Sequence, residues 1–319
     1  MVNIIFRTDA DDGTSAGTGH LSRILKIRKY YLGTKKKINF IFLFKNLNNS
    51  HKIFSKFKNK IIYDNTFVKK LSYINSNDII IIDTPFGADE KLKKFCAIKK
   101  INNILLIDDL NRPKFKNAYI FNGIISFKKQ LPCGRKTYQG SKYVILDKEY
   151  SNTYQLKNKN AILVATGGTD KKKLLFKYSN YLIKNYDYKI YVIIGNQVKA
   201  NNPIFSLDSN KLIFVRSPKS LLKYYLNAKI CIITGGIIMF ENLALKKKSL
   251  IHQSYHHQKY AVDYFKNNNQ IIKVGENNKI NFKKMDYYLK SNINNNKNIF
   301  NKIDGKGFFR LQQILKKFK

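Results

Sequence analysis

Short runs of consecutive apolar residues alternate with segments of helical spacing along the whole chain. In the first half, apolar runs occur at 3–6, 38–44, 60–64, 78–83 and 103–109. Strands that are apolar on both faces are typical of a parallel sheet covered by helices on both sides. The first half therefore predicts a doubly wound α/β domain, with a helix over about 19–31 after its first strand.

The second half repeats this pattern. Its apolar runs occur at 160–168, 188–195, 211–215, 228–236, 248–253 and 270–275. Between the halves, residues 148–159 are polar and have no period, which is typical of a linker. We therefore predict two doubly wound domains facing across a cleft, residues 1–150 and 151–319, with a final helix from Gly307.

The chain has a formal net charge of +40, and 53 of its 60 basic residues are lysines spread along its length. Asparagine, isoleucine, tyrosine and phenylalanine are abundant too, and all of these residues have A/T-rich codons. Genomic base composition explains this better than selection for a polyanion, because nucleic-acid sites gather arginine and aromatic residues in one patch. We expect no nucleic-acid partner, and at most weak attraction to an acidic membrane surface or a phosphorylated substrate.

No apolar run approaches the roughly 20 residues of a membrane-spanning helix. The first residues also lack the pattern of a signal peptide, so we expect a cytoplasmic protein. The three cysteines, Cys96, Cys133 and Cys231, are far apart and predict reduced thiols. We expect no cofactor and no metal ion.

The first candidate site follows the first predicted strand, in the sequence FRTDADDGTSAGTGHLSRIL. Gly17 and Gly19 would let backbone amides approach a ligand, and His20 would lie in the first helical turn. A neutral imidazole there can take a proton from water or a hydroxyl group, although a histidine that only packs the turn is the alternative. Arg7 and Asp9 point the same way from the strand end and are expected to pair, near the substrate or only structurally.

Two glycine-rich turns in the second half are candidates for binding a diphosphate. In ATGGTD, a strand leads into Gly167, Gly168, Thr169 and Asp170, although an aspartate that caps the next helix is the alternative. In TGGIIMFENLAL, another strand leads into Gly235 and Gly236 before a helix. Glu241 on that helix can accept hydrogen bonds from both ribose hydroxyls, or it is simply solvated.

Polar residues after other strands are candidates for contacts with a sugar. His257 and Gln258 lie in SYHHQKY, where a carboxylate suited to complete a metal site is missing. Asp83 and Asp109 end two strands of the first half and could hold sugar hydroxyls, with turn formation as the alternative.

The order of several segments resembles the PseG family. These hydrolases act on UDP-2,4-diacetamido-2,4,6-trideoxy-β-L-altropyranose in pseudaminic acid biosynthesis and are related to MurG-like GT-B glycosyltransferases. The resemblance covers roughly residues 2 to 275 and is carried by FRTDA, GTGHLSRIL, LLIDD, GSKYVILDKEY, ILVATGGTDKKKL and GG…ENLALKKKSL…HHQKYAVDYF.

The resemblance implies a GT-B fold of two Rossmann-like domains, with the sugar held by the N-terminal domain and UDP by the C-terminal one. It implies that His20 deprotonates a water that attacks the anomeric carbon with inversion. The glycine turns would face the diphosphate, and Glu241 matches the acidic residue of the nucleotide-binding helix.

The chain departs from the family pattern in three places. The loop before GTGH is longer, His257 stands where the family tends to have asparagine, and Thr84-Pro85-Phe86 replaces an expected aromatic hydroxyl. An inverting glycosyltransferase that uses a UDP-sugar donor is therefore the alternative function. A basic protein that binds polyanions without catalysis is the third hypothesis.

Overall fold

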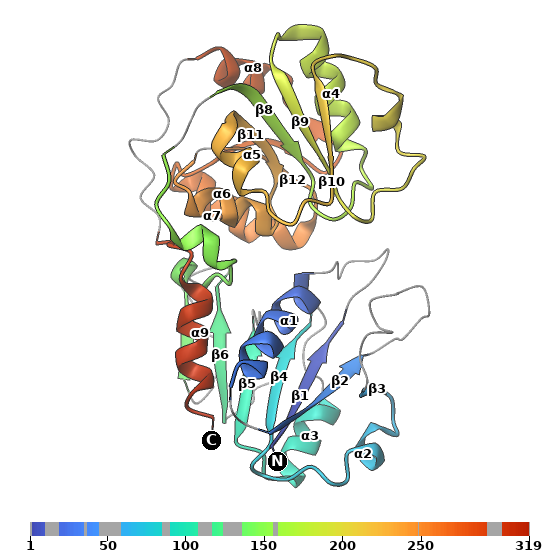
Figure 1. The fold of residues 1–319 in the computed structure, drawn as a ribbon, viewed down its shortest axis with the longest axis vertical. Helices are drawn as coiled ribbons and strands as arrows, with labels where there is room; N and C mark the ends of the chain where they lie inside the picture. Colours follow the sequence, from blue (N-terminus) through green and yellow to red (C-terminus); the bar gives the residue numbers. More distant parts are fainter. Residues whose placement is uncertain are drawn as a thin grey trace. The chain divides into compact units, whose positions relative to one another are not determined.

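The computed structural model describes residues 2–9, 19–34, 37–44, 59–84, 90–107, 117–123, 136–155, 159–247, 249–291 and 302–318. The chain divides into two compact units (Figure 1). Unit 1 comprises Met1–Ile145 and Gly307–Lys319, and unit 2 comprises Leu146–Lys306.

Unit 1 contains a seven-stranded sheet in the order β3-β2-β1-β4-β5-β6-β7, and all of its neighbouring strands are parallel. The strands are β1 (Val2–Thr8), β2 (Ile38–Phe44), β3 (Lys60–Ile62), β4 (Ile79–Asp83), β5 (Asn103–Ile107), β6 (Ala118–Asn122) and β7 (Lys136–Gln139). The order reverses between β1 and β4, so the loops that follow these two strands diverge from one point of the sheet edge.

Successive residues of each central strand pack into cores on opposite faces of this sheet. In β1, Ile4 and Phe6 belong to one core and Ile5 to the other. The first core also contains side chains of α1 (Gly19–Leu32), and the second contains side chains of α2 (Phe67–Lys70) and α3 (Glu90–Ile98). These two covered faces explain the unbroken apolar runs in the sequence.

The C-terminal helix α9 (Gly307–Leu315) belongs to unit 1, which corrects the predicted second domain of 151–319. Its apolar side is buried in the same core as α1, through Leu311, Ile314 and Leu315. Phe318 follows it and lies 5.3 Å from the ring of Tyr119 on β6. Figure 1 shows α9 alongside β6. Helical spacing predicts which side of this helix is buried, but not which sheet receives it.

Unit 2 contains a second seven-stranded sheet, in the order β10-β9-β8-β11-β12-β13-β14. Its strands are β8 (Lys159–Ala165), β9 (Lys189–Ile194), β10 (Leu212–Arg216), β11 (Ala228–Thr234), β12 (Ser249–Gln253), β13 (Ile272–Glu276) and β14 (Lys279–Ile280). Only the pair β13–β14 is antiparallel among these described strands. The order reverses between β8 and β11, as it does between β1 and β4 in unit 1.

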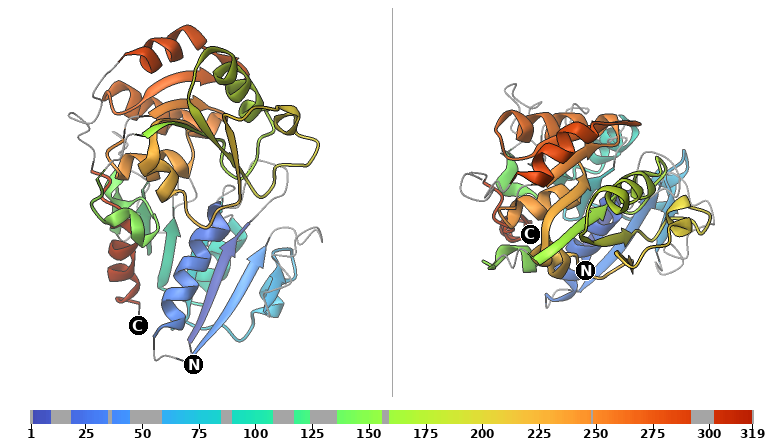
Figure 2. Two further views of the ribbon diagram at one scale, coloured as in Figure 1. Left: turned by 45° about the horizontal axis from the view of Figure 1, so that its top comes forward. Right: turned by 90° about the horizontal axis from the view of Figure 1, so that it is seen from above.

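Helices cover both faces of this second sheet (Figure 2). The core on one face contains side chains of α4 (Leu174–Asn185) and α8 (Phe282–Lys290). The strands in the middle of the sheet also contact α5 (Leu222–Asn227), α6 (Ile237–Ala244) and α7 (Lys259–Asn267). Within the described residues, short 3-10 helices join other elements: η2 (Ser141–Tyr143), η3 (Lys148–Ser151), η4 (Pro203–Ser206) and η5 (His256–Gln258).

The predicted linker has defined structure at its start. Residues Lys148–Ser151 form η3, and Tyr150 is buried with its ring 6.4 Å from that of Tyr225. The described cysteines, Cys96 and Cys231, are free and buried, as the sequence predicts. Cys133 lies outside the described residues.

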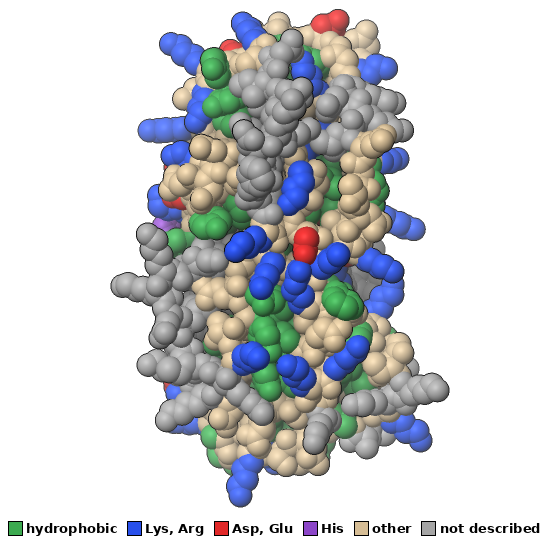
Figure 3. Space-filling view, turned by 90° about the vertical axis from the view of Figure 1, so that its left-hand side faces the viewer, with side chains coloured by type: hydrophobic (Ala, Val, Ile, Leu, Met, Phe, Trp, Pro, Cys, Tyr) green, Lys and Arg blue, Asp and Glu red, His purple; other side chains and the backbone are tan. Residues whose placement is uncertain are grey.

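Basic side chains are not confined to one patch of the face drawn in Figure 3. Figure 3 shows lysine and arginine side chains across the face that it draws, with few acidic side chains among them. Within the described part of the chain, no helix is long and apolar enough to cross a membrane.

The packing of α9 predicts which unit its loss would weaken. Leu311 has no exposed surface, so Leu311→Ala should lower the free energy of unfolding of unit 1 by about 3 kcal/mol. Hydrogen exchange resolved by peptide should show faster exchange in β1 and β6 and unchanged exchange in β8 and β11. The matched control is Gln313→Ala, because Gln313 lies on the exposed side of the same helix. Faster exchange confined to unit 2 would contradict the placement of α9.

Candidate functional site

A buried polar cluster lies where the strand order of unit 1 reverses. His20 is the second residue of α1, which follows β1, and Asp83 is the last residue of β4. Thr8 at the end of β1 pairs with Asp83 in the sheet register, so the two strands end side by side. The sequence predicts a histidine in the first helical turn, and the structure has it there.

His20, Arg23 and Asp83 are held together by short contacts. The His20 Nδ1 atom lies 2.6 Å from Asp83 Oδ1. Arg23 binds the same carboxylate with both arms of its guanidinium, from Nε to Oδ2 at 2.7 Å and from Nη2 to Oδ1 at 2.7 Å. Asp83 has no exposed surface, whereas the side chain of His20 is 18% exposed. This two-armed geometry is the strong form of an arginine–carboxylate ion pair.

The contacts of His20 Nδ1 indicate which of the two ring nitrogens carries the hydrogen. Arg23 Nη2 lies 2.9 Å from Nδ1, which would require Nδ1 to accept, whereas the contact with Asp83 requires Nδ1 to donate if the carboxylate is ionised. We assign donation to Asp83, because this contact is shorter and Arg23 already donates to the same oxygen. The Nε2 atom then carries the free lone pair, and it has no hydrogen-bond partner among the described residues.

The charge of Asp83 is maintained by its neighbours. Burial alone would raise the pKa of Asp83, but the Arg23 guanidinium, followed by His20, lowers it to about 2. The carboxylate is therefore ionised at neutral pH and orients the imidazole. We predicted that Asp83 would hold sugar hydroxyls. Because its oxygens are occupied and its surface is fully covered, its role in this structure is instead to position His20.

Arg7 and Asp9 form the expected pair at the end of β1. Arg7 Nη1 lies 2.8 Å from Asp9 Oδ1, and both side chains are buried. The guanidinium also donates to the carbonyl of Thr8 at 3.0 Å and lies 4.7 Å from the centre of the Tyr63 ring. These contacts fix the strand end structurally, and the predicted role in substrate binding remains a prediction.

Three predicted site positions fall outside what the structure describes: Gly17, Asp109 and the side chain of His257. Gly19 is described and is the exposed first residue of α1. A Cβ atom built at Gly19 would meet no described residue within 4 Å.

In unit 2, both glycine turns lie at the point where the strand order reverses. Gly167 and Gly168 follow β8, and Gly235 and Gly236 follow β11, its neighbour in the sheet. The two turns are linked by a hydrogen bond from Thr234 Oγ1 to the Thr166 carbonyl at 3.1 Å. Thr166 Oγ1 also donates to the carbonyl of Thr169 at 2.9 Å, which holds the first turn closed.

Backbone N–H groups are available at both turns. Within the described part of the chain, the N–H groups of Gly167, Gly168 and Thr169 have no acceptor. Gly236 is the N-cap of α6 and contributes no side-chain cap, and the N–H groups of Ile237 and Ile238 in the first turn have no acceptor among the residues that the structure describes. Adjacent N–H groups and a helix N-terminus are together suited to bind an anion.

Backbone conformation explains one of the glycines here, and close packing explains two others. Gly167 has a φ of +88°, a conformation that L side chains rarely adopt. A Cβ atom at Gly235 would lie 2.4 Å from the Val262 side chain on α7. Gly195, which follows β9, lets the chain pack closely against the turn after β8. A Cβ atom built at Gly195 would lie 2.2 Å from the Gly167 carbonyl oxygen.

Asp170 caps the start of α4 with its carboxylate, and its predicted role in nucleotide binding remains a prediction. Its carboxylate accepts hydrogen bonds from the backbone N–H of Leu174 at 2.8 Å and from that of Leu175 at 3.3 Å. The side chain is buried, and this burial raises its pKa to about 6. The capping alternative is therefore the one that the structure supports. Thr169 instead lies near another loop, with Oγ1 3.4 Å from the Tyr255 hydroxyl.

Glu241 lies on α6, five positions after Gly236, and is partly exposed. Its Oε2 atom lies 3.1 Å from the hydroxyl of Tyr225, which is fully buried on α5. Burial and the neighbouring carboxylate raise the pKa of Tyr225, so this phenol remains a donor. Tyr225 thus holds the carboxylate in place beside the start of α6.

The side chain of Gln258 packs against the glycine turn that precedes α6. Its Oε1 atom accepts hydrogen bonds from the backbone N–H of Ser254 at 2.8 Å and of Tyr255 at 3.3 Å. Its side chain is buried, and its Nε2 atom lies 3.9 Å from the position of a Cβ atom at Gly236. The residue therefore shapes the glycine turn, and contact with a sugar remains a prediction.

Arg23 and Gly195 were missed by reasoning from the sequence. Arg23 carries a signal that could have identified it, because a residue three positions after His20 lies on the same side of a helix. Gly195 ends an apolar run, as many structural glycines do, and only the fold shows that it contacts the turn after β8.

No protein-family model matches the chain, and no curated protein matches it in sequence. Solved structures do resemble it. MurG from Acinetobacter baumannii superposes with a TM-score of 0.62 at 12% identity, covering 99% of this chain and 100% of that one. UGT89C1 from Arabidopsis thaliana, complexed with UDP, gives a TM-score of 0.60 at 9% identity, covering 100% of both chains.

A third similar structure is the UDP-GlcNAc 2-epimerase from Neisseria meningitidis bound to UDP-GlcNAc. It gives a TM-score of 0.52 at 12% identity, covering 99% of this chain and 100% of that one. At such low identity the likeness shows the fold. The chain has the two-domain α/β architecture of the GT-B fold, as the sequence predicts.

The pKa of Asp83 predicts a specific loss of stability in acid. Because its folded-state value of about 2 lies below the ordinary value of 3.8, the unfolded chain takes up the proton first as the pH falls. The ionised carboxylate therefore contributes about 2 kcal/mol above pH 4, and roughly half of this is lost by about pH 3. The free-energy difference between the natural protein and Asp83→Asn in urea unfolding should shrink accordingly between about pH 6 and pH 3. A constant difference would contradict the assignment.

Proposed function

We propose that the protein hydrolyses a UDP-sugar, releasing UDP and a free diacetamido-trideoxy sugar by inverting attack of water at the anomeric carbon. This is the reaction that the resemblance to the PseG family implies, as a step of pseudaminic acid or surface polysaccharide biosynthesis. One observation carries the proposal: His20 donates from Nδ1 to the ionised, buried Asp83, which leaves Nε2 able to accept a proton.

In the proposed reaction, His20 is the catalytic residue and Asp83 and Arg23 are positioning residues. Nε2 accepts a proton from water as the water oxygen forms a bond to the anomeric carbon. The bond from that carbon to the β-phosphate oxygen breaks, and its electron pair leaves with UDP. The charge that develops on the imidazole is stabilised by Asp83, which remains ionised.

The second unit supplies the nucleotide-binding residues in this proposal. The free N–H groups of the turn after β8 and of the start of α6 would bind the diphosphate and stabilise the charge of the leaving group. Glu241 would accept hydrogen bonds from the ribose hydroxyls. Support comes from two structures of the same fold, which contain UDP and UDP-GlcNAc. No metal ion is required by this scheme.

An inverting glycosyltransferase is the second candidate. Two of the similar structures are MurG and UGT89C1, and the second of them was solved with UDP. His20 would then deprotonate a hydroxyl of an acceptor instead of water, with the same bonds broken at the donor. The two candidates differ in one observable: a hydrolase releases UDP when no acceptor is present.

The experiment that tests the proposal is incubation of the pure protein with a panel of UDP-sugars, with assay of both UDP and free sugar. We expect release from a diacetamido-trideoxy donor without an acceptor, and His20→Ala should lower kcat by roughly 100-fold or more. Lys29→Ala, an exposed position on the same helix, is the control. Release of UDP only after addition of an acceptor would exclude the hydrolase.

Glu241→Ala should weaken UDP binding and leave kcat nearly unchanged. Loss of hydrogen bonds from a carboxylate to the ribose should reduce affinity by roughly 10-fold or more in calorimetry. A UDP analogue without the 2′ and 3′ hydroxyls makes the test specific, because the variant and the natural protein should bind it equally. An equal loss for UDP and the analogue would show that Glu241 contacts another part of the ligand.

A further inference from the structure

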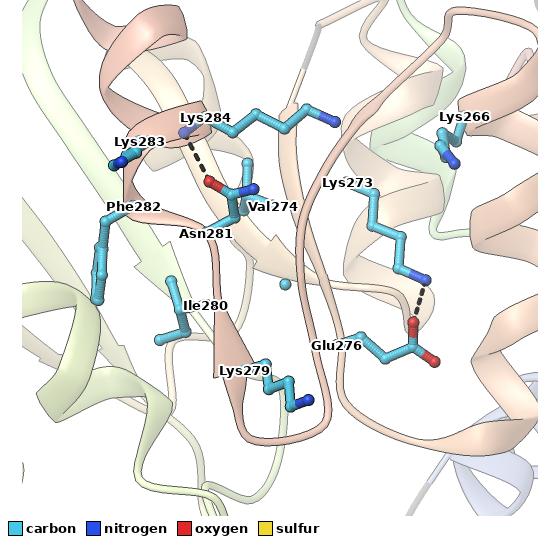
Figure 4. A pocket seen from close by; sticks show the side chains of 11 residues that line it. Lys266, Lys273, Val274, Glu276, Lys279, Ile280, Asn281, Phe282, Lys283 and Lys284 are labelled. Atoms are coloured by element: carbon cyan, nitrogen blue, oxygen red, sulfur yellow. Dashed lines mark hydrogen bonds and ion pairs between the residues drawn. The ribbon is translucent and has the colours of Figure 1, made fainter.

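A hollow of about 600 Å³ lies in unit 2 (Figure 4), and neither the glycine turns nor Glu241 contribute to its lining. It is formed by β13, the hairpin to β14, the start of α8 and the end of α7. Eleven residues line it, and the charged ones are Lys266, Lys273, Glu276, Lys279, Lys283 and Lys284. We call this feature the lysine hollow.

The lysine content of the hollow exceeds that of the chain. Five of its 11 lining residues are lysines, whereas 53 of all 319 residues are, so about two would be expected in a random selection of this size. Base composition accounts for the general abundance of lysine but not for this local concentration. All five lysines lie within residues 266–284, where the end of α7, the β13–β14 hairpin and the start of α8 follow one another and together enclose the hollow.

Most of this charge is not neutralised. Glu276 is the single carboxylate of the lining, and it is held by Lys273 Nζ at 2.7 Å and by Gln253 Nε2 at 3.0 Å. The ammonium groups of the other four lysines have no ion pair or hydrogen bond with any residue that the structure describes. Figure 4 shows Lys273, Lys279 and Lys284 arranged around the hollow. Like charges repel one another, so an anion between these ammonium groups would be stabilised.

The start of α8 adds a second source of positive potential. Asn281 caps this helix of nine residues by accepting from the N–H of Lys284 at 2.9 Å. The N–H groups of Phe282 and Lys283 in the first turn have no acceptor within the described residues. Both residues line the hollow, so the positive end of the helix faces the same hollow that Lys279 and Lys284 line.

We propose that the lysine hollow binds an oligophosphate anion, as a free molecule or as the headgroup of a phospholipid. Lysine presents a compact charge with three donors and lacks the planar fork of arginine, which suits tetrahedral oxygen groups in several orientations. A multiply charged anion can contact ammonium groups from more than one wall of the hollow at once. This site is independent of the proposed UDP-sugar reaction, since none of its residues belongs to the glycine turns.

The test is calorimetric titration of the full chain with pyrophosphate, in saturating UDP so that the glycine turns do not contribute. The double variant Lys279→Met/Lys284→Met should bind pyrophosphate at least about tenfold more weakly than the natural protein. The matched control is Lys184→Met/Lys290→Met, which removes the same charge from exposed helix ends of the same unit and should change affinity by less than about twofold. Thermal unfolding of each variant checks that the unit remains folded.

Two outcomes would overturn the proposal: an equal loss in both double variants, or no binding of either pyrophosphate or lipid. Flotation with phosphatidylglycerol vesicles distinguishes the two sources of phosphate. Binding to vesicles that depends on Lys279 and Lys284 identifies a headgroup, whereas binding of pyrophosphate alone identifies a free anion. If UDP itself does not bind, the proposed function fails, but the comparison between the two double variants still decides on the hollow.

Discussion

The buried, ionised carboxylate of Asp83 is the interaction on which the candidate site of unit 1 depends. An isolated charge at a fully covered position would be neutralised, so its ionised state requires both Arg23 and His20. The same pair of contacts orients the imidazole and fixes which of its nitrogens carries the hydrogen. Charge, orientation and tautomer therefore follow from a single arrangement, and none of the three can be changed alone.

The position of this arrangement follows from sheet topology. In both units the strand order reverses between two adjacent parallel strands, β1 and β4 in one and β8 and β11 in the other. At such a point the helices that follow the strands pack on opposite faces, and the loops leave the sheet edge open between them. Unit 1 has a histidine at this point and unit 2 has two glycine turns, so the same strand arrangement holds an imidazole in one unit and, in the other, backbone N–H groups that have no acceptor among the described residues.

Much of this organisation could be predicted from the sequence. The apolar runs predict β1 and β4 correctly, because strands covered on both faces leave no polar break. β6 and β7 were not predicted. β7 has polar residues, Lys136–Gln139, and lies at the edge of the sheet, whereas the sequence AYIFN of β6 is buried and its apolar residues carry a strand signal. For side chains, the sequence predicts less. A glycine turn can be recognised in the sequence, but the capping of α4 by Asp170 and the complete burial of Asp83 depend on how the chain folds.

The basic residues show most clearly that the amino-acid composition of the chain does not by itself identify a binding site. A net charge of +40 has no specific meaning where lysines extend into solvent, because each is screened within about 10 Å at ordinary ionic strength. It acquires meaning where the fold brings ammonium groups to a shared space with few carboxylates, as at Lys279 and Lys284. Arg23 is the opposite case: one cation, bound through both arms to a buried carboxylate, determines the chemistry of a histidine. Arg23, Lys279 and Lys284 differ from the other basic residues in the groups that surround them, and not in the charge that they carry.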